Sequence, residues 1–154
     1  MRAKPSLAAA FWWFLTGLFI LSSAPLRALA AEELKLQALL VWATDDAKPP
    51  EGKNYKALEP DVRKQLKALK WRSFFEVKRI DFTVSPVATK KIALSDKCEL
   101  DVKSTGNANL EVTLFGRGKE AAKQKQALPK GEILVLAGNA PNETAWLVIV
   151  KRVE

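Results

Sequence analysis

Apolar and polar residues alternate along much of the chain from Leu34 to the C terminus, a pattern typical of β-strands with one buried face. The first such segment is 34–42, and its apolar side consists of Leu34, Leu36, Ala38, Leu40 and Trp42. Near its end, Leu39 and Val41 add apolar residues to the other side, which indicates that both faces are covered there. We expect a strand at 34–42, with Trp42 in the core.

A loop and then a helix are predicted next. Segment 44–58 contains Pro49-Pro50 and Gly52, which disfavour regular structure. Pro60 suits the first position of a helix, where its missing N–H costs nothing. An apolar stripe at spacing i, i+4 and i+7 follows, formed by Val62, Leu66 and Leu69. The sequence therefore predicts a helix over 60–70.

The remainder of the chain is predicted to be β. In segment 73–84 the apolar phase slips near Lys78-Arg79, which indicates a bulge or a change of sheet. Further strands are expected around 92–94, 98–102, 110–114, 133–137 and 145–151, the last two joined by a loop at 138–142 and the last with Trp146 in the core.

Segment 119–128 is ambiguous. Its Glu, Ala and Gln residues favour a helix. Its position between the turn formers Gly116-Arg117-Gly118 and Pro129 favours a lysine-rich edge strand instead, and we predict a strand. The expected fold class is mainly β with one helix (α+β). We expect a small antiparallel β-sandwich or partly closed barrel of about eight strands, with helix 60–70 on one end or face.

The N-terminal segment has the features of an export signal. Arg2 and Lys4 precede a long uncharged stretch, Pro25 interrupts it, and Ala28-Leu29-Ala30 places small residues where a signal peptidase cuts. We therefore expect a cleaved secretory signal peptide over 1–30.

A single domain over 31–154 would remain after this cleavage, in the periplasm or outside the cell. The alternative is an uncleaved N-terminal membrane anchor, because about 20 apolar residues suffice to span a bilayer. The leader contains three of the 25 Lys and Arg residues and none of the 17 Asp and Glu residues, so the net charge falls from +8 to +5 (22 minus 17).

Cys98 is the only cysteine, so the chain forms no internal disulfide. It shares the inward side of its strand with Leu100 and Val102, and we interpret it as a core residue. The neighbouring Lys97 and Lys103 offer the alternative of an activated thiol or an intermolecular bridge. An export leader without a disulfide framework is more typical of a bacterial envelope protein than of a small eukaryotic secreted domain.

Histidine is absent, which removes His-dependent nucleophilic catalysis and His-ligated metal sites. Asp45-Asp46 is interpreted as a solvated turn rather than a calcium loop, because the regularly spaced oxygens and central glycine of such a loop are missing. We expect no catalytic residue, no metal and no cofactor.

The most suggestive chemical feature is a cluster of basic residues on and after the predicted helix. It consists of Arg63, Lys64, Lys67, Lys70 and Arg72. We regard these as candidate anion-binding residues, although a solvated helix face requires charges for its own sake. A net charge of +5 is small for a dedicated nucleic-acid binder, so no specific nucleic acid is expected.

The leading functional hypothesis is a non-enzymatic envelope module that binds another protein or has a structural role. The surfaces expected to contact a protein partner are the Lys-rich strand 119–125 and the basic helix. The alternative is an electrostatic binder of an anionic polymer or lipid, and the third is an enzyme that uses carboxylates or lysine. The oligomeric state is left open.

Overall fold

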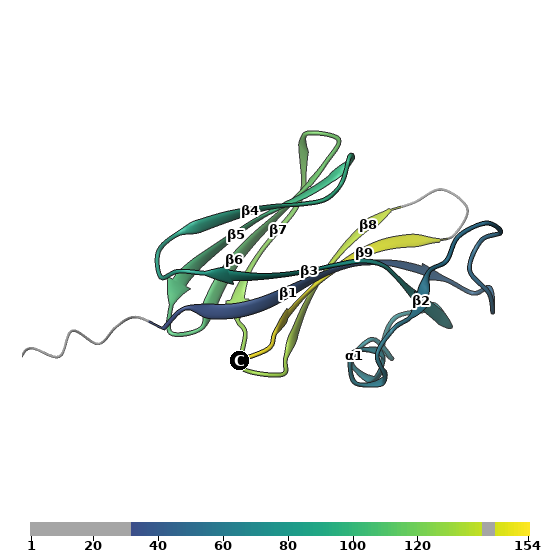
Figure 1. The fold of residues 1–154 in the computed structure, drawn as a ribbon, viewed down its shortest axis with the longest axis horizontal. Helices are drawn as coiled ribbons and strands as arrows, with labels where there is room; N and C mark the ends of the chain where they lie inside the picture. Colours follow the sequence, from purple (N-terminus) through teal and green to yellow (C-terminus); the bar gives the residue numbers. More distant parts are fainter. Residues whose placement is uncertain (1–31, 140–143) are drawn as a thin grey trace, which may run out of the picture. The chain divides into compact units, whose positions relative to one another are not determined.

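The computed structural model describes residues 32–139 and 144–154 (Figure 1). The predicted leader, its cleavage after Ala30 and residues 140–142 of the predicted loop lie outside the described residues.

The described strands form two antiparallel sheets and no closed barrel. The five-stranded sheet has the order β2-β3-β1-β9-β8 and consists of β1 (Leu34–Thr44), β2 (Lys56–Ala57), β3 (Ser73–Val84), β8 (Ile133–Asn139) and β9 (Ala145–Arg152). The four-stranded sheet has the order β4-β5-β6-β7 and consists of β4 (Thr89–Ser95), β5 (Cys98–Gly106), β6 (Asn109–Gly116) and β7 (Lys119–Ala127). The predicted small β-sandwich is confirmed, and so is the strand predicted over 119–128.

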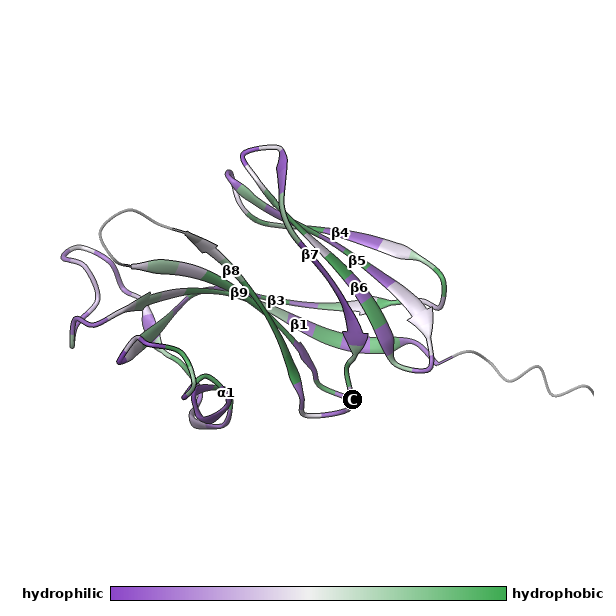
Figure 2. Ribbon diagram, turned by 180° about the vertical axis from the view of Figure 1, so that it is seen from behind, coloured by the Kyte–Doolittle hydropathy of each residue, from purple (hydrophilic) through white to green (hydrophobic). Residues whose placement is uncertain are grey.

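The main core lies between the two sheets. Its buried side chains come from alternate positions of the strands and include Leu36, Leu40, Leu100, Val112, Leu134 and Val148. Figure 2 shows hydrophobic residues along the central strands β1 and β9, and largely hydrophilic residues along β7. Alternation therefore placed one face of the long strands toward the core, as the sequence predicts, whereas both residues of the short β2 are exposed.

A second apolar cluster covers the other face of the five-stranded sheet. Leu39, Val41 and Ile149 project to that face and pack with Val62 and Leu66. The helix α1 (Pro60–Gln65) lies on this side, away from the four-stranded sheet (Figure 1). Both faces of β1 are therefore buried near its end, as Leu39 and Val41 indicate in the sequence.

The helix is shorter than predicted, because α1 ends at Gln65 rather than at Lys70. The N–H of Leu66 donates to the carbonyl of Arg63, and the N–H of Leu69 donates to that of Leu66. These i→i+3 hydrogen bonds tighten the chain into turns. Leu66 and Leu69 still reach the apolar cluster, so the predicted stripe is retained beyond the end of the helix.

The bulge predicted near Lys78-Arg79 is confirmed. In the pairing of β1 with β3, Leu40 is opposite Lys78 and Val41 is opposite Glu76, so Val77 is the extra residue. An extra residue reverses the alternation of the residues that follow it. Phe75 and Ile80 consequently lie on the same face of the sheet.

Two tryptophans predicted to lie in the core do not. Trp42 is half-buried, and the side chain of Trp146 is 39% exposed. Both lie on the face of the five-stranded sheet that carries Leu40 and Val148, but beyond the cluster that the second sheet covers. Their exposure follows from where the four-stranded sheet ends, which alternation does not reveal.

Candidate functional site

The edge strands of the two sheets differ in how they are protected. An edge strand presents unpaired N–H and C=O groups, and charged side chains or a short length usually prevent unwanted pairing. Three edges have such protection: Lys56 on the two-residue β2, Lys90 and Lys91 on β4, and Lys119, Lys123 and Lys125 on β7. The fourth, β8, has the sequence ILVLAGN and carries no charge or proline. It is the least protected edge among the described strands.

The backbone orientation of β8 is set by the turn that precedes it. Gly131 has φ +82°, its N–H donates to the carbonyl of Arg152, and the N–H of Arg152 donates to the carbonyl of Glu132. This is the hydrogen-bond pattern of a bulge with glycine at its first position. Glu132 and Arg152 thereby form a hydrogen-bonded pair of the antiparallel ladder. In such a ladder every second residue bonds to the partner strand, so Leu134 and Leu136 bond to β9.

The remaining backbone groups of β8 face outward. Because Leu134 and Leu136 continue the ladder with β9, the N–H and C=O groups of Ile133, Val135 and Ala137 point away from it. The side chains of Ile133 and Val135 are half-buried against the helix-side cluster, whereas Ala137 is exposed. The outer edge of β8 therefore combines three outward donor–acceptor pairs with apolar side chains. Among the described residues these groups pair with no other strand, although β7 of the other sheet lies beside part of β8.

The predicted Lys-rich contact strand is β7, whose lysines alternate with half-buried residues. Lys123 pairs with Glu111 of the neighbouring strand at 3.1 Å. This hydrogen bond and the positive charge of Lys123 lower the pKa of the Glu111 carboxyl. The charges on β7 are thus partly matched within its own sheet, as in the solvated face of an antiparallel sheet.

The five predicted anion-binding residues are all exposed, and three of them contact different groups. Arg63 donates to the backbone carbonyl of Arg72 at 3.3 Å, which brings these two residues together. Lys64 pairs with Asp61 at 3.6 Å, and the ammonium of Lys70 lies 5.1 Å from the ring centroid of Trp71. Lys67 lies just beyond α1 on the exposed side. Their role in anion binding stays a hypothesis.

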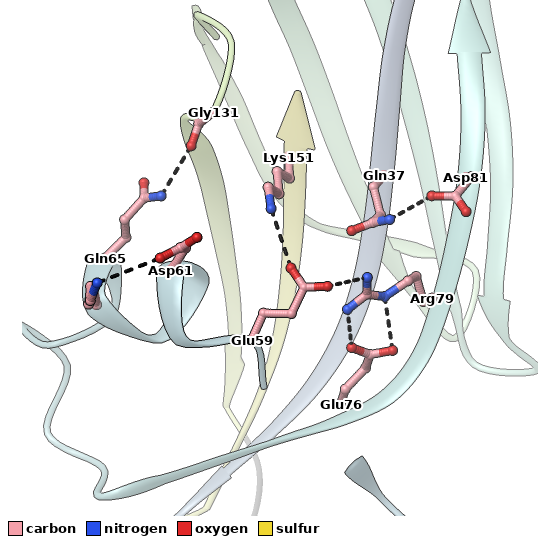
Figure 3. Close-up of polar contacts among 10 residues, drawn as sticks. Gln37, Glu59, Asp61, Gln65, Glu76, Arg79, Asp81, Gly131 and Lys151 are labelled. Atoms are coloured by element: carbon pink, nitrogen blue, oxygen red, sulfur yellow. Dashed lines mark hydrogen bonds and ion pairs between the residues drawn. The ribbon is translucent and has the colours of Figure 1, made fainter. Parts of the chain in front are cut away.

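A network of ion pairs that the sequence did not reveal lies beside the helix (Figure 3). Arg79 of β3 donates to Glu76 at 2.5 and 3.0 Å and to Glu59 at 2.5 Å, and Lys151 of β9 lies 3.4 Å from the other oxygen of Glu59. Nearby, Gln37 donates to Asp81 at 2.6 Å. The network ties the residue that precedes α1 to two strands of the sheet.

The electrostatics of this network are those of structural ion pairs. The hydrogen bond from Arg79 holds the pKa of Glu59 below its ordinary value of 4.5, and hydrogen bonds from Glu76 and Glu59 raise the pKa of Arg79. Both changes move the pKa away from neutral pH, whereas general acid–base catalysis favours a pKa near it. The network therefore supplies charge pairing rather than a proton donor or acceptor.

The surroundings of Cys98 and of Asp45, the first residue of the Asp45-Asp46 pair, indicate structural roles for both. Cys98 is half-buried against the main core, and burial followed by the charge of Glu99 raises the pKa of its thiol. This shift opposes the activated thiol that Lys97 and Lys103 would produce. Asp45 accepts a hydrogen bond from the backbone of Arg72 at 3.1 Å, so it links its loop to the start of β3.

Comparisons of the chain with protein-family models, with curated proteins and with solved structures find no match in any of the three. Within residues 32–139 and 144–154, no helix is long and apolar enough to cross a membrane, and no group of three or more Cys, Asp or Glu side chains could hold a metal ion.

Proposed function

We propose that the chain is an exported, non-enzymatic envelope module that binds a partner protein by adding an extended segment of the partner to the edge of β8. The observation that carries this proposal is the contrast between β8 and the other edges. The outward backbone groups of Ile133, Val135 and Ala137 offer a strand-addition site, whereas lysines mark each of the other three edges.

Strand addition obtains its affinity from backbone hydrogen bonds and its specificity from alternate side chains. A strand beside β8 would place every second side chain next to Ile133 and Val135, which already pack on the helix-side cluster. The partner segment is therefore expected to be extended and to carry apolar residues at alternate positions. Its other side chains would meet the face that contains Leu134, Leu136 and Gly138.

A substitution at Ala137 tests the proposal with little disturbance of the fold. Ala137→Pro removes one outward N–H from an exposed position, and proline is tolerated on an edge whose N–H faces solvent. Ala137→Val is the matched control, because it adds a side chain but keeps the N–H. We expect the tagged full chain and Ala137→Val to retain the same stoichiometric envelope protein after cross-linking, and Ala137→Pro to lose it at an unchanged thermal midpoint.

Hydrogen exchange on the recovered complex provides a second measurement. Strand addition should slow exchange at the amides of Ile133, Val135 and Ala137, while Leu134 and Leu136 change little because they already bond to β9. Protection elsewhere with none at these three amides would contradict the proposal. So would undiminished capture by Ala137→Pro, or a complex that contains only copies of this chain.

A further inference from the structure

Three aromatic side chains form a row across the five-stranded sheet, and we call them the aromatic row. They are Phe75 on β3, Trp42 on β1 and Trp146 on β9. In the sheet, Trp42 is directly opposite Phe75 on one side and directly opposite Trp146 on the other. All three lie on the inner face of the sheet, but outside the cluster that the second sheet covers. Exposed tryptophan at the end of a sheet is typical of binding surfaces.

The central ring of the aromatic row is held in place by its neighbours. Trp42 stacks on Phe75 with ring centroids 6.1 Å apart and planes inclined by 28°, and Tyr55 meets it edge-on at 6.5 Å. The next position along the same row is Gly138 on β8, which pairs with Trp146. Because glycine has no side chain, Gly138 adds none to the row beside Trp146. Phe75 is buried and supports Trp42 from the side, so the half-buried Trp42 and the exposed Trp146 form the accessible apolar platform of the row.

An open groove of about 660 Å³ runs beside Trp42. Its walls are formed by Trp42, Asp46, Ala47, Lys48, Pro49, Pro50 and Thr144. Asp46 is oriented by Thr44: the Thr44 hydroxyl donates to Oδ2 of Asp46 at 3.3 Å and accepts from the Asp46 N–H at 3.2 Å. Among the described residues, none donates a hydrogen bond to the second carboxylate oxygen, Oδ1, so it can accept one from a ligand. The groove thus presents an aromatic ring, a fixed acceptor and a cationic donor.

We infer that the aromatic row and this groove bind a neutral polysaccharide chain. Sugar rings have an apolar C–H face that stacks on aromatic rings, and their hydroxyls donate to a carboxylate and accept from an ammonium. The opposite charges of Asp46 and Lys48 leave the groove without a net charge, which suits an uncharged ligand. Its openness suits a polymer that passes through rather than an enclosed small molecule.

A proline-rich peptide is the competing occupant, because such peptides also dock in aromatic-lined grooves. Proline has no N–H and offers only carbonyl acceptors. A polyproline segment would leave Oδ1 of the exposed Asp46 to water, whereas every sugar residue supplies several hydroxyl donors to it. The chemistry of Asp46 therefore favours the polysaccharide.

Affinity electrophoresis of the full chain tests the inference, with soluble neutral glucans, xylan and galactomannan as probes and a polyproline peptide as the competing ligand. We expect at least one neutral polysaccharide to retard the protein, with little change at high salt because no charge pairing is involved. Trp146→Ala and Asp46→Asn should each weaken retardation about tenfold. Val153→Ala is the control, since it removes another exposed apolar side chain from a different surface.

Three outcomes would overturn the inference: no retardation by any neutral polysaccharide, unchanged retardation of both groove variants, or binding of polyproline instead. The polysaccharide site and the strand-addition edge both adjoin Gly138, but they use different chemical groups: the side chains of Trp146 and Asp46 in one and the outward amides of β8 in the other. Ala137→Pro should therefore leave polysaccharide binding unchanged, and Asp46→Asn should leave capture of the protein partner unchanged.

Discussion

The carboxylate of Glu59 links the start of α1 to two strands of the five-stranded sheet. It directly precedes α1 but does not cap the helix with its side chain. It instead accepts hydrogen bonds from Arg79 on β3 and Lys151 on β9. Glu59 thereby connects α1, β3 and β9.

Replacing Glu59 with glutamine should lower the free energy of unfolding by about 0.5–1 kcal/mol near neutral pH, the range of partly exposed ion pairs. The pKa of Glu59 is lowered in the folded state, so its stabilisation is complete above the ordinary value of 4.5 and is lost as the pH falls through the lowered pKa. Urea unfolding of the wild type and Glu59→Gln should therefore differ most at about pH 7, and the difference should shrink as the pH falls from 4.5 toward about 3. An equal difference at both pH values would contradict this role.

At the scale of elements, the turn before β8 decides which backbone groups of that strand face outward. Gly131 adopts φ +82° there, which β-carbon-bearing residues rarely adopt. The bulge that Gly131 forms with Arg152 fixes the phase of the β8–β9 ladder. The strand-addition edge thus depends on a residue outside the strand itself.

Gly131→Ala should destabilise the protein by about 1 kcal/mol because of its positive φ. Gly116→Ala is the matched control: its φ is not in that region, and an added Cβ would meet only the Cβ of Ala121 at an ordinary 3.9 Å. Chemical denaturation of both variants measures the difference. Equal stability of the two variants would show that the turn tolerates alanine.

At the scale of the whole molecule, the proposed function requires export, which rests on the N-terminal sequence. We predict that the protein recovered outside the cytoplasm begins at Ala31, because Ala28 and Ala30 occupy the small-residue positions of the cleavage site. Replacing Ala30 with tryptophan should block the cut, whereas Leu29→Val should not. N-terminal sequencing or intact mass decides, and a wild-type protein that retains residues 1–30 would indicate an anchor instead.

The sequence by itself determined the local structure. Alternation placed the strands, the phase slip near Lys78-Arg79 located the bulge at Val77, and the turn formers around 116–118 outweighed the helical composition of β7. These features depend on each residue's own backbone preference and on neighbours a few positions away, which are visible in the chain. The basic candidate residues likewise lie on the surface, where their charge and the helical spacing put them.

Only the tertiary structure decided which strands became edges and where the second sheet ended. The apolar sequence of β8 resembles that of a central strand, although β8 is an edge strand. Trp42 and Trp146 continue the alternation of the core residues, although both lie outside the core. Their exposure depends on the order of strands and the reach of a sheet formed by other residues. The Glu59–Arg79–Lys151 network also joins residues from distant segments. Both proposed binding surfaces therefore arise from long-range packing, which local pattern does not encode.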